Sequence, residues 1–230
     1  MHLLCDGFFT LDKSFVVYMK YMGQPCDCAL KSLLILTSDE RILVDTGIGE
    51  LPEKYRRLYA VRRGSEQTLK AQLAQHGLKP EDIDVVVNTH LHFDHCGNNA
   101  LFANAKFVVQ EDEFRYAFEP ERFQQSGYIR ELFDLKLDYK LVRGEHRITD
   151  DVLVVPTPGH SVGHQSVIVK DGDRNFVYCG DAAPVKENLE RRNIPGVLYC
   201  AHKALNSIDY LRSIDNAVYI YSHDNEKMSL

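Results

Sequence analysis

Several features that would define other classes of protein are missing from this sequence. No apolar run approaches the roughly 18 residues that a membrane span requires. The first residues lack a charged segment followed by a long apolar stretch, so we expect no secretory signal and a cytoplasmic protein without a membrane partner. Six cysteines in 230 residues are too few for a disulfide scaffold, which favours reduced thiols. Cys26 and Cys28 lack the CxxC spacing of zinc knuckles or thioredoxin-like sites, so a structural role is favoured for them.

The charge balance gives no sign of nucleic-acid binding. Lysine and arginine number 27 against 33 acidic residues, a net charge of −6, whereas nucleic-acid binders usually carry a basic excess. A length of 230 residues suits one domain, and the chain has no internal repeat, low-complexity stretch or linker composition. We therefore expect residues 1–230 to form a single domain, and the sequence leaves its oligomeric state open.

Short apolar runs bounded by turn residues predict strands interrupted by helices. Nine strands are expected at 31–38, 41–45, 84–88, 106–110, 139–143, 152–156, 166–170, 175–180 and 217–221. Helices are expected at 66–75, 111–119, 127–137 and 204–213. Ser65 would cap the first helix and Gly77 would stop it, while Asp39 and Glu40 would join the first two strands as a hairpin. Strand blocks alternating with helices indicate an α/β or α+β layered fold.

The segment 88–97 carries four potential metal ligands within six residues, namely His90, His92, Asp94 and His95. No regular helix or strand keeps all four side chains on one face, because helical neighbours repeat at three and four and strand neighbours at two. The side chains can converge only where the chain leaves a strand and turns tightly. Imidazole nitrogens and carboxylate oxygens at this density suit zinc, with iron or manganese as alternatives.

Three further segments each end an apolar strand with a possible ligand. They are 154–164 with His160, 176–181 with Asp181, and 217–224 with His223. Loops at strand ends often carry function, because a rigid sheet can aim them at a common point. Together with the first cluster they supply five histidines and two aspartates. Seven ligands are too many for one tetrahedral zinc ion and suit two ions that share a bridging ligand.

The order of these motifs resembles the metallo-β-lactamase superfamily of dinuclear metallohydrolases. An HxHxDH motif is followed by a Gly-His turn at His160, by Asp181 and by a late histidine, His223. Residues 44–47 resemble the Asp-Thr-Gly turn near the start of that fold, and the resemblance covers essentially the whole chain. It implies an α+β fold, a four-layer αββα sandwich in which two mixed β-sheets are flanked by helices.

The resemblance also implies a role for each ligand. The first metal ion would be held by His90, His92 and His160, the second by Asp94, His95 and His223, and Asp181 would bridge them. The ions would be Zn²⁺, with iron, manganese or cobalt as alternatives. Asp45 and His164 would orient the ligands by contacting them from behind.

Within the superfamily, the chain most resembles the N-acyl-homoserine lactone lactonases. The segments that carry this resemblance are 89–97, 157–166, 186–188 and 222–226. The lactonases usually place a substrate-binding tyrosine three residues after the bridging aspartate, and this chain has Pro184 there. Because proline cannot donate a hydrogen bond, the substrate carbonyl would be activated by the metal alone or by another phenol. The phenols near ligand-bearing segments are Tyr178, Tyr199 and Tyr221.

The predicted reaction is hydrolysis of a lactone or other carboxylic ester, most closely an N-acyl-homoserine lactone, as in a quorum-quenching lactonase. A hydroxide bridging the two metal ions would attack the carbonyl, and Asp94 would bind metal and relay the proton. A thioesterase of the glyoxalase II type, or a phosphodiesterase, is an alternative on the same fold. A mononuclear-iron persulfide dioxygenase is a further alternative, because it shares the same motif.

Substrate contacts are expected from an N-terminal loop at 8–21 and from residues 51–64. The second segment holds five basic residues and two tyrosines. It predicts either a lid that meets an anionic or amphipathic substrate, or the solvated face of a short helix.

Overall fold

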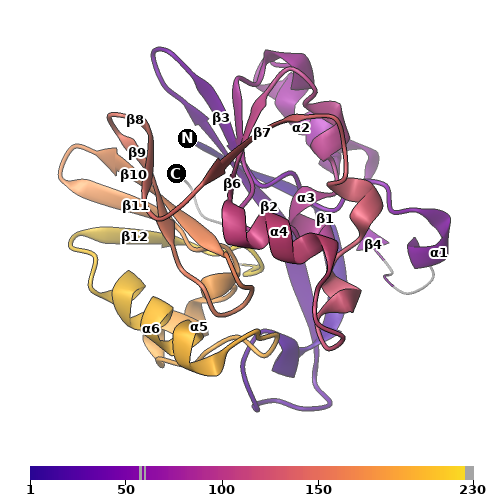
Figure 1. Cartoon of the computed structure of the whole chain (residues 1–230), viewed down its shortest axis with the longest axis vertical. Helices are drawn as coiled ribbons and strands as arrows, with labels where there is room; N and C mark the ends of the chain where they lie inside the picture. The colour runs from indigo at the N-terminus through magenta and orange to yellow at the C-terminus, as the bar shows by residue number, and fades with distance from the viewer. Residues whose placement is uncertain (57–58, 60, 226–230) are drawn as a thin grey trace.

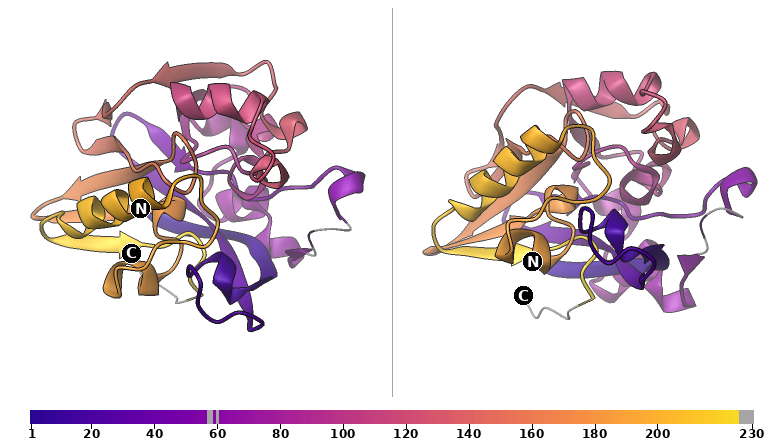
Figure 2. Two further views of the ribbon diagram at one scale, coloured as in Figure 1. Left: turned by 60° about the horizontal axis from the view of Figure 1, so that its bottom comes forward. Right: turned by 90° about the horizontal axis from the view of Figure 1, so that it is seen from below.

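Two β-sheets lie face to face, and helices cover their outer sides (Figures 1 and 2). This computed structural model describes residues 1–56, 59 and 61–225. In Figure 1 the first sheet is mostly indigo to magenta, and the second sheet with its helices is orange and yellow. In the described part of the chain, no helix is both long and apolar enough to cross a membrane.

The first sheet has seven strands in the order β4-β1-β2-β3-β5-β6-β7. Their bounds are β1 His2–Asp12, β2 Pro25–Leu36, β3 Arg41–Val44, β4 Val61–Arg62, β5 Val85–Val87, β6 Lys106–Gln110 and β7 Asp138–Val142. Strands β3, β5, β6 and β7 run parallel to one another, whereas β4, β1, β2 and β3 pair antiparallel. The sheet is therefore mixed.

The second sheet has five strands in the order β12-β11-β10-β9-β8. Their bounds are β8 His146–Thr149, β9 Val152–Pro156, β10 Gln165–Asp171, β11 Arg174–Tyr178 and β12 Ala217–Ile220. Only the β11–β12 pair is parallel, and the other pairs are antiparallel. Because β9 and β11 both run antiparallel to β10, the strands β9, β11 and β12 all point the same way.

Six α-helices accompany the two sheets in the described part of the chain. They are α1 Glu53–Arg56, α2 Leu69–Gln75, α3 Phe93–Cys96, α4 Glu111–Phe118, α5 Lys186–Glu190 and α6 Ala201–Arg212. Leu33 and Ile35 of β2 pack into the apolar cluster between the sheets, whereas Leu34 faces outward against Leu69 and Leu73 of α2. Figure 2 shows α6 lying along the outer side of the second sheet. The predicted αββα sandwich of two mixed sheets is thus confirmed.

This arrangement brings several strand ends to one edge of the sandwich. β3 and β5 are parallel neighbours, so the residues after Val44 and after Val87 leave the first sheet together. β9, β11 and β12 likewise end at the same edge of the second sheet, and they lead into the segments that carry His160, Asp181 and His223. All the loops singled out in the sequence therefore begin at the ends of parallel strands.

All nine predicted strands are present, as β2, β3, β5, β6, β7, β9, β10, β11 and β12, with shifted ends. The predicted hairpin joins β2 to β3 through residues 37–40, a loop of four residues rather than two. The expected loop at 8–21 is wrong in part, because β1 continues to Asp12. A β-bulge between Cys5 and Phe8, with Gly7 at φ +116°, breaks the alternation that would have identified β1.

Two predicted helices differ from the structure. Thr68, not Ser65, caps α2, because its Oγ1 accepts a hydrogen bond from the Ala71 N–H at 3.2 Å. The stop at Gly77 is correct, and this glycine has φ +71°. The helix at 127–137 is wrong: the segment forms short 3₁₀ turns around an extended Tyr128, whose hydroxyl donates to the buried Glu113 at 2.9 Å. A tertiary contact overrides the helical pattern there.

Gly97 is a point where the fold leaves no room for a side chain. A Cβ at this position would lie 2.0 Å from the backbone oxygen of Ile48, in the loop that follows β3. We expect Gly97→Ala to lower the free energy of unfolding by about 2–3 kcal/mol, because backbone must shift to relieve the overlap. Urea denaturation measures this change. Gly64→Ala is the matched control, because its Cβ would have its nearest contact at 3.6 Å, and equal effects of the two substitutions would contradict the prediction.

Candidate metal centre

The chain turns tightly after β5, as the four potential ligands within six residues predicted. His90 and His92 follow the strand, His92 in extended backbone, and the single turn of α3 then begins at Phe93. This change from extended to helical backbone redirects Asp94 and His95 relative to the two preceding histidines. All four side chains thereby face one region beyond the end of the strand.

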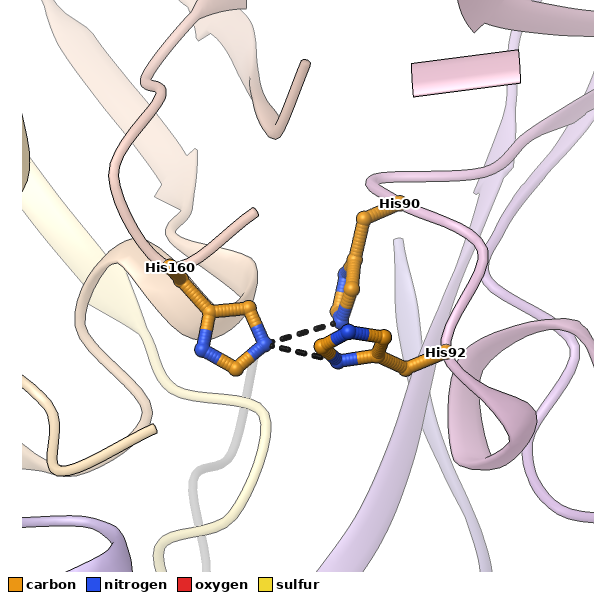
Figure 3. Close-up of side chains that lie close together, drawn as sticks. All are labelled: His90, His92 and His160. Atoms are coloured by element: carbon orange, nitrogen blue, oxygen red, sulfur yellow. Dashed lines mark hydrogen bonds between the residues drawn. The ribbon is translucent and has the colours of Figure 1, made fainter. Parts of the chain in front are cut away.

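Three histidine rings converge in the first group of candidate ligands, as Figure 3 shows. The Nε2 atom of His160 lies 3.1 Å from Nε2 of His90 and 3.0 Å from Nδ1 of His92. His90 and His92 come from the loop after β5, whereas His160 comes from the loop after β9 of the second sheet. The group therefore spans the two sheets.

A second group lies beside the first. The Nε2 atoms of His95 and His223 lie 3.7 and 3.5 Å from Oδ2 of Asp94. Asp181 stands between the groups: its Oδ1 is 3.3 Å from His95 Nε2 and 3.2 Å from His223 Nε2. Its Oδ2 faces the other way, 3.5 Å from His160 Nε2. One carboxylate thus presents an oxygen to each group.

The structure brings together all seven residues that the sequence proposed as ligands. Among the described residues, three groups of ligand atoms lie within 4.8 Å of one another. They are His90–His92–His160, His90–His95–Asp181, and Asp94–His95–His223. Each predicted ligand belongs to at least one of these groups.

The ring tautomers are set by acceptors on the far side of each imidazole. Nδ1 of His160 lies 3.0 Å from the Val197 carbonyl oxygen, and Nδ1 of His223 lies 2.7 Å from the Ala29 carbonyl oxygen. A carbonyl can only accept, so both Nδ1 atoms carry the proton. In their neutral forms, both rings therefore present the lone pair of Nε2 to the cluster.

These lone pairs provide a test of whether a metal ion fits. In the first group, Nε2 of His90 and Nε2 of His160 lie 3.1 Å apart. Because the Nδ1 proton of each ring has an acceptor on the far side, these two nitrogens are unprotonated and cannot hydrogen-bond to each other. Ligands on a tetrahedral zinc ion, with bonds of about 2.0–2.1 Å, lie about 3.3 Å apart. Nε2 of His95 is also buried and has no hydrogen-bond partner among the described residues. Donor chemistry and spacing both fit divalent cations.

The protonation states also suit metal binding. Burial lowers the pKa of His90 and His92 well below the usual value, and neighbouring imidazoles lower it further, so both rings are neutral. Burial would raise the pKa of Asp181, but His223 and other imidazoles hold it well below its usual range. Burial would lower the pKa of His95, but nearby carboxylates, Asp181 foremost, raise it well above 6.5. A divalent cation would displace that proton.

Asp45 contacts the ligands from behind, in the place the sequence proposed. Its Oδ2 lies 2.8 Å from Nδ1 of His95, and its carboxylate accepts from both the N–H and the hydroxyl of Thr89. The Thr89 hydroxyl is then free to accept from Nδ1 of His90 at 3.0 Å. Asp45 has φ +58°, a left-handed backbone that few non-glycine residues adopt. Its fully buried carboxylate therefore fixes the tautomers of two candidate ligands.

His164 is positioned to hold Asp181, not to bind metal. The Asp181 N–H donates to Nε2 of His164 at 2.9 Å, so this nitrogen is an acceptor and Nδ1 carries the proton. Nδ1 then donates to Thr157 Oγ1 at 2.9 Å, Thr157 donates to Ser166 Oγ at 2.8 Å, and Ser166 donates to the Cys179 carbonyl. The direction of every bond in this buried chain is fixed by the backbone group at each end.

Glu113 of α4 is a functional candidate that the sequence did not reveal. Its side chain is fully buried, and each carboxylate oxygen accepts two hydrogen bonds. Oε1 accepts from the Leu91 N–H and the Tyr128 hydroxyl, at 3.1 and 2.9 Å. Oε2 accepts from the Ser161 hydroxyl and the Gly163 N–H, at 2.7 and 2.9 Å. Glu113 thus ties the loop after β5 to the loop after β9.

A pocket of about 390 Å³ opens over the candidate ligands. Its floor includes His92, Asp94, His160, Asp181 and His223. Its apolar wall includes Phe9, Leu11, Phe15, Val16, Phe93 and Phe123. Among the described residues that line it, none is lysine or arginine. The pocket therefore joins a polar floor to an uncharged, largely apolar wall.

Pro184 lines this pocket, and its carbonyl oxygen accepts the His223 N–H at 2.9 Å. The three phenols proposed from the sequence do not line it: Tyr178 is buried, with its hydroxyl donating to the Lys31 carbonyl, and Tyr199 and Tyr221 lie elsewhere. The phenol in the described lining is Tyr59. Its ring lies 4.2 Å from that of Phe93, and its hydroxyl donates to the Ser126 carbonyl at 3.1 Å.

The basic segment 51–64 is only partly accounted for. Residues 57, 58 and 60 lie outside the described residues, as does Glu226 of the C-terminal motif. The other basic side chains of the segment contact carboxylates: Lys54 with Glu131, Arg56 with Glu50, Arg62 with Asp27, and Arg63 with Asp6 and Glu50. These four cations are paired within the protein.

Comparison with known proteins agrees with this geometry. The model of the metallo-beta-lactamase superfamily matches residues 28–223. An N-acyl homoserine lactonase of Bacillus cereus is 30% identical over 240 residues, covering 99% of this chain and 94% of its own length. One of Rhizobium radiobacter is 34% identical over 168 residues, covering 66% of this chain and 62% of its own. A solved N-acyl homoserine lactone hydrolase, with N-hexanoyl-L-homoserine bound at its catalytic metal centre, is 28% identical with a TM-score of 0.86, covering 97% of this chain and 92% of its own.

Glu113→Gln tests whether one carboxylate holds the two ligand loops together. A glutamine has a single acceptor oxygen, so its amide group would face two of the four donors. We expect the free energy of unfolding to fall by about 2–3 kcal/mol and the bound metal to decrease. Urea denaturation and metal analysis measure both changes. Glu111→Gln, on the same helix, removes ion pairs with the exposed side chains of Arg115 and Arg143 and should have a much smaller effect. Comparable losses of stability and metal in the two variants would contradict the prediction.

Proposed function

Because this chain belongs to the metallo-β-lactamase superfamily, we propose that it opens the ring of N-acyl homoserine lactones with two divalent metal ions. The chain is a metal-dependent hydrolase of ester bonds. The lactone assignment is supported by relatives that carry this name and by the shape of the pocket. Since the candidate ligands come from loops of both sheets, we also propose that residues 1–230 act as one domain.

The substrate class is inferred from one observation, that the pocket has a polar floor and a largely apolar wall. An N-acyl homoserine lactone has a polar, uncharged head and an apolar acyl chain. The head suits the floor around Asp94 and Asp181, and the chain suits the wall that includes Phe9 and Phe123. Burial of the acyl chain against this wall supplies binding energy in proportion to its length.

The same lining disfavours the alternative substrates. Phosphodiesters and the glutathione part of a glyoxalase II substrate carry negative charges, which proteins usually bind with arginine or lysine. The described lining offers neither, and its charged groups at the floor are the carboxylates Asp94 and Asp181. An anionic substrate would meet repulsion there unless bound metal offset it.

The two groups of converging side chains suggest which residues bind each metal ion. We assign His90, His92 and His160 to one ion, Asp94, His95 and His223 to the other, and Asp181 to both. Zinc is the ion that this donor set suits, with iron, manganese or cobalt as alternatives. Ions held there polarise a carbonyl and supply a nucleophile from water at neutral pH.

Asp94 is the proposed proton carrier. Its carboxylate lines the pocket floor, so it can take the proton that the attacking water loses. It can return that proton to the ring oxygen when the carbon–oxygen bond of the lactone breaks. Water and lactone are thereby converted into one open-chain hydroxy acid.

Tyr59 is the proposed donor to the substrate carbonyl, in place of the tyrosine that Pro184 replaces. Burial, followed by the charge of Asp94, raises the pKa of Tyr59, so its hydroxyl keeps its proton and can donate. In the substrate-free protein this hydroxyl is satisfied by the Ser126 carbonyl. It could exchange that partner for a bound substrate.

The substrate assignment is tested by hydrolysis assays on metal-loaded protein. A pH-stat panel should include N-acyl homoserine lactones of several chain lengths, a simple γ-lactone, a glutathione thioester and a phosphodiester. We expect kcat/KM to be at least tenfold higher for acyl homoserine lactones than for the other classes, and to rise with chain length. His92→Ala and Asp181→Ala should abolish the activity.

Two outcomes would overturn the assignment. Background lactone hydrolysis with strong thioester cleavage would favour the glyoxalase II type. Oxygen uptake with a persulfide by protein containing one iron would favour a dioxygenase.

Tyr59→Phe tests the proposed carbonyl donor. Loss of one hydrogen bond should reduce kcat/KM for acyl homoserine lactones about five- to tenfold, which corresponds to about 1–1.4 kcal/mol. Metal content should not change, because Tyr59 is not among the candidate ligands. Tyr55→Phe is the control, since Tyr55 does not line the pocket. A Tyr59→Phe protein with unaltered kcat/KM would show that the metal alone activates the carbonyl.

A further inference from the structure

Cys26 and Cys28 form a close pair of thiols at the start of β2. Their sulfur atoms lie 3.8 Å apart. The two side chains share one face of the strand because they are two residues apart. Across the β1–β2 pair, Cys26 is opposite Leu11 and Cys28 is opposite Phe9, and both of these partners line the pocket. The thiol pair therefore lies beside the pocket wall.

The two thiols differ in access. Cys28 is fully buried, whereas Cys26 is half-buried and reachable from solvent. The remaining cysteines, all in the described part of the chain, are Cys5, Cys96, Cys179 and Cys200. None of these four has a second thiol in contact with it, so Cys26 and Cys28 alone combine an accessible thiol with an adjacent one.

We propose that Cys26 and Cys28 are a reversible redox pair that a peroxide converts into an intramolecular disulfide. The sulfur of Cys26 attacks the peroxide and takes one oxygen, giving a sulfenic acid and releasing water. The sulfur of Cys28 then displaces that oxygen as a second water, and the sulfur–sulfur bond forms. Two thiols are oxidised and one hydrogen peroxide is reduced to two waters.

The strand geometry makes this bond reversible. Residues two apart on an extended strand have Cα atoms about 6.4–6.8 Å apart, from the rise per residue. Disulfides usually join Cα atoms separated by about 4.4–6.8 Å, most often near 6 Å. The strand separation lies at the upper end of this range, so the start of β2 shortens as the bond approaches its common geometry. A disulfide formed against such resistance is more easily reduced by cellular thiols.

Oxidation of this pair would act on the second group of candidate ligands. Ala29 follows Cys28 directly, and its carbonyl accepts the Nδ1 proton of His223 at 2.7 Å. The Ala29 N–H also donates to the His223 carbonyl at 3.3 Å. On the neighbouring strand, the Phe9 ring opposite Cys28 lies 5.7 Å from the His223 ring. Shortening β2 displaces the groups that orient His223, so metal should be held less tightly; this step rests on the proposed metal centre.

The experiment uses the full chain loaded with zinc and treated with a small excess of hydrogen peroxide. We expect the intact mass to fall by two hydrogen atoms and the thiol count of the denatured protein to fall from six to four. Peptide mapping should place the link within residues 26–28, and dithiothreitol should reverse it. Zinc transfer to a chromogenic chelator should become about tenfold faster in the oxidised protein.

Two serine variants serve as matched probes. Cys26→Ser should prevent both the mass change and the faster zinc transfer, while leaving the packing of Cys28 intact. Cys200→Ser removes another half-buried thiol and should respond like the wild type. Because none of the proposed ligands is a thiol, peroxide can affect zinc only through the link or through nonspecific damage, which the Cys26→Ser variant would also show.

Distinct outcomes overturn distinct parts of the inference. Oxygen addition at Cys26 without a link, or a link to another cysteine, would refute the redox pair. A 26–28 link without any change in zinc transfer would refute its coupling to His223. The zinc content of the untreated protein is measured first and tests the proposed metal centre by itself. Disulfide formation is read from the mass and the thiol count, so it is tested whether or not zinc binds.

Discussion

The metal centre depends on one constraint: four of its imidazoles, those of His90, His95, His160 and His223, must hold a proton on the side away from the cluster. The Val197 and Ala29 carbonyls impose this on His160 and His223, and the Asp45 carboxylate imposes it on His95. Without these acceptors the rings could rotate or change tautomer, and protons would occupy the space where lone pairs now meet. Asp45 adopts an unfavourable left-handed backbone conformation, which places its carboxylate behind His95.

The position of the centre follows from where the apolar core stops. Between the sheets the packing is aliphatic, with residues such as Val85, Val87 and Val154. Polar ligands follow three or four residues beyond the ends of β5, β9, β11 and β12, so they are buried by the same layers yet reach the surface through the pocket. Burying several carboxylates and imidazoles without partners would be strongly unfavourable. Glu113 and Asp45 are matched by hydrogen-bond donors of the protein, whereas the imidazole nitrogens that face the cluster would be matched by a cation.

The sequence predicts the cluster well because its signal is local. Four potential ligands within six residues, directly after a buried strand, indicate a metal site by themselves, and His160, Asp181 and His223 each follow a strand of their own. Glu113 gives no such signal: its donors lie 15 to 50 residues away, and on its own it resembles any acidic residue of an exposed helix. The bulge in β1 interrupts the alternation of side chains by which a strand is recognised in a sequence. The segment 127–137 has a helical pattern, but contacts formed only in the folded chain, such as that of Tyr128 with Glu113, favour another conformation.

The pocket wall and the ligand supports come from the same strands. On β1, Phe9 and Leu11 point into the pocket while Thr10 between them is exposed, as the period of two requires. On β2, the backbone of Ala29 orients His223 while the neighbouring side chains pack under the wall. Changes in the wall are therefore transmitted to the ligands through a single pair of strands. Phe9 of the wall also lies with its ring 5.7 Å from that of His223, so a substitution at Phe9 changes the packing around a candidate ligand as well as the shape of the wall.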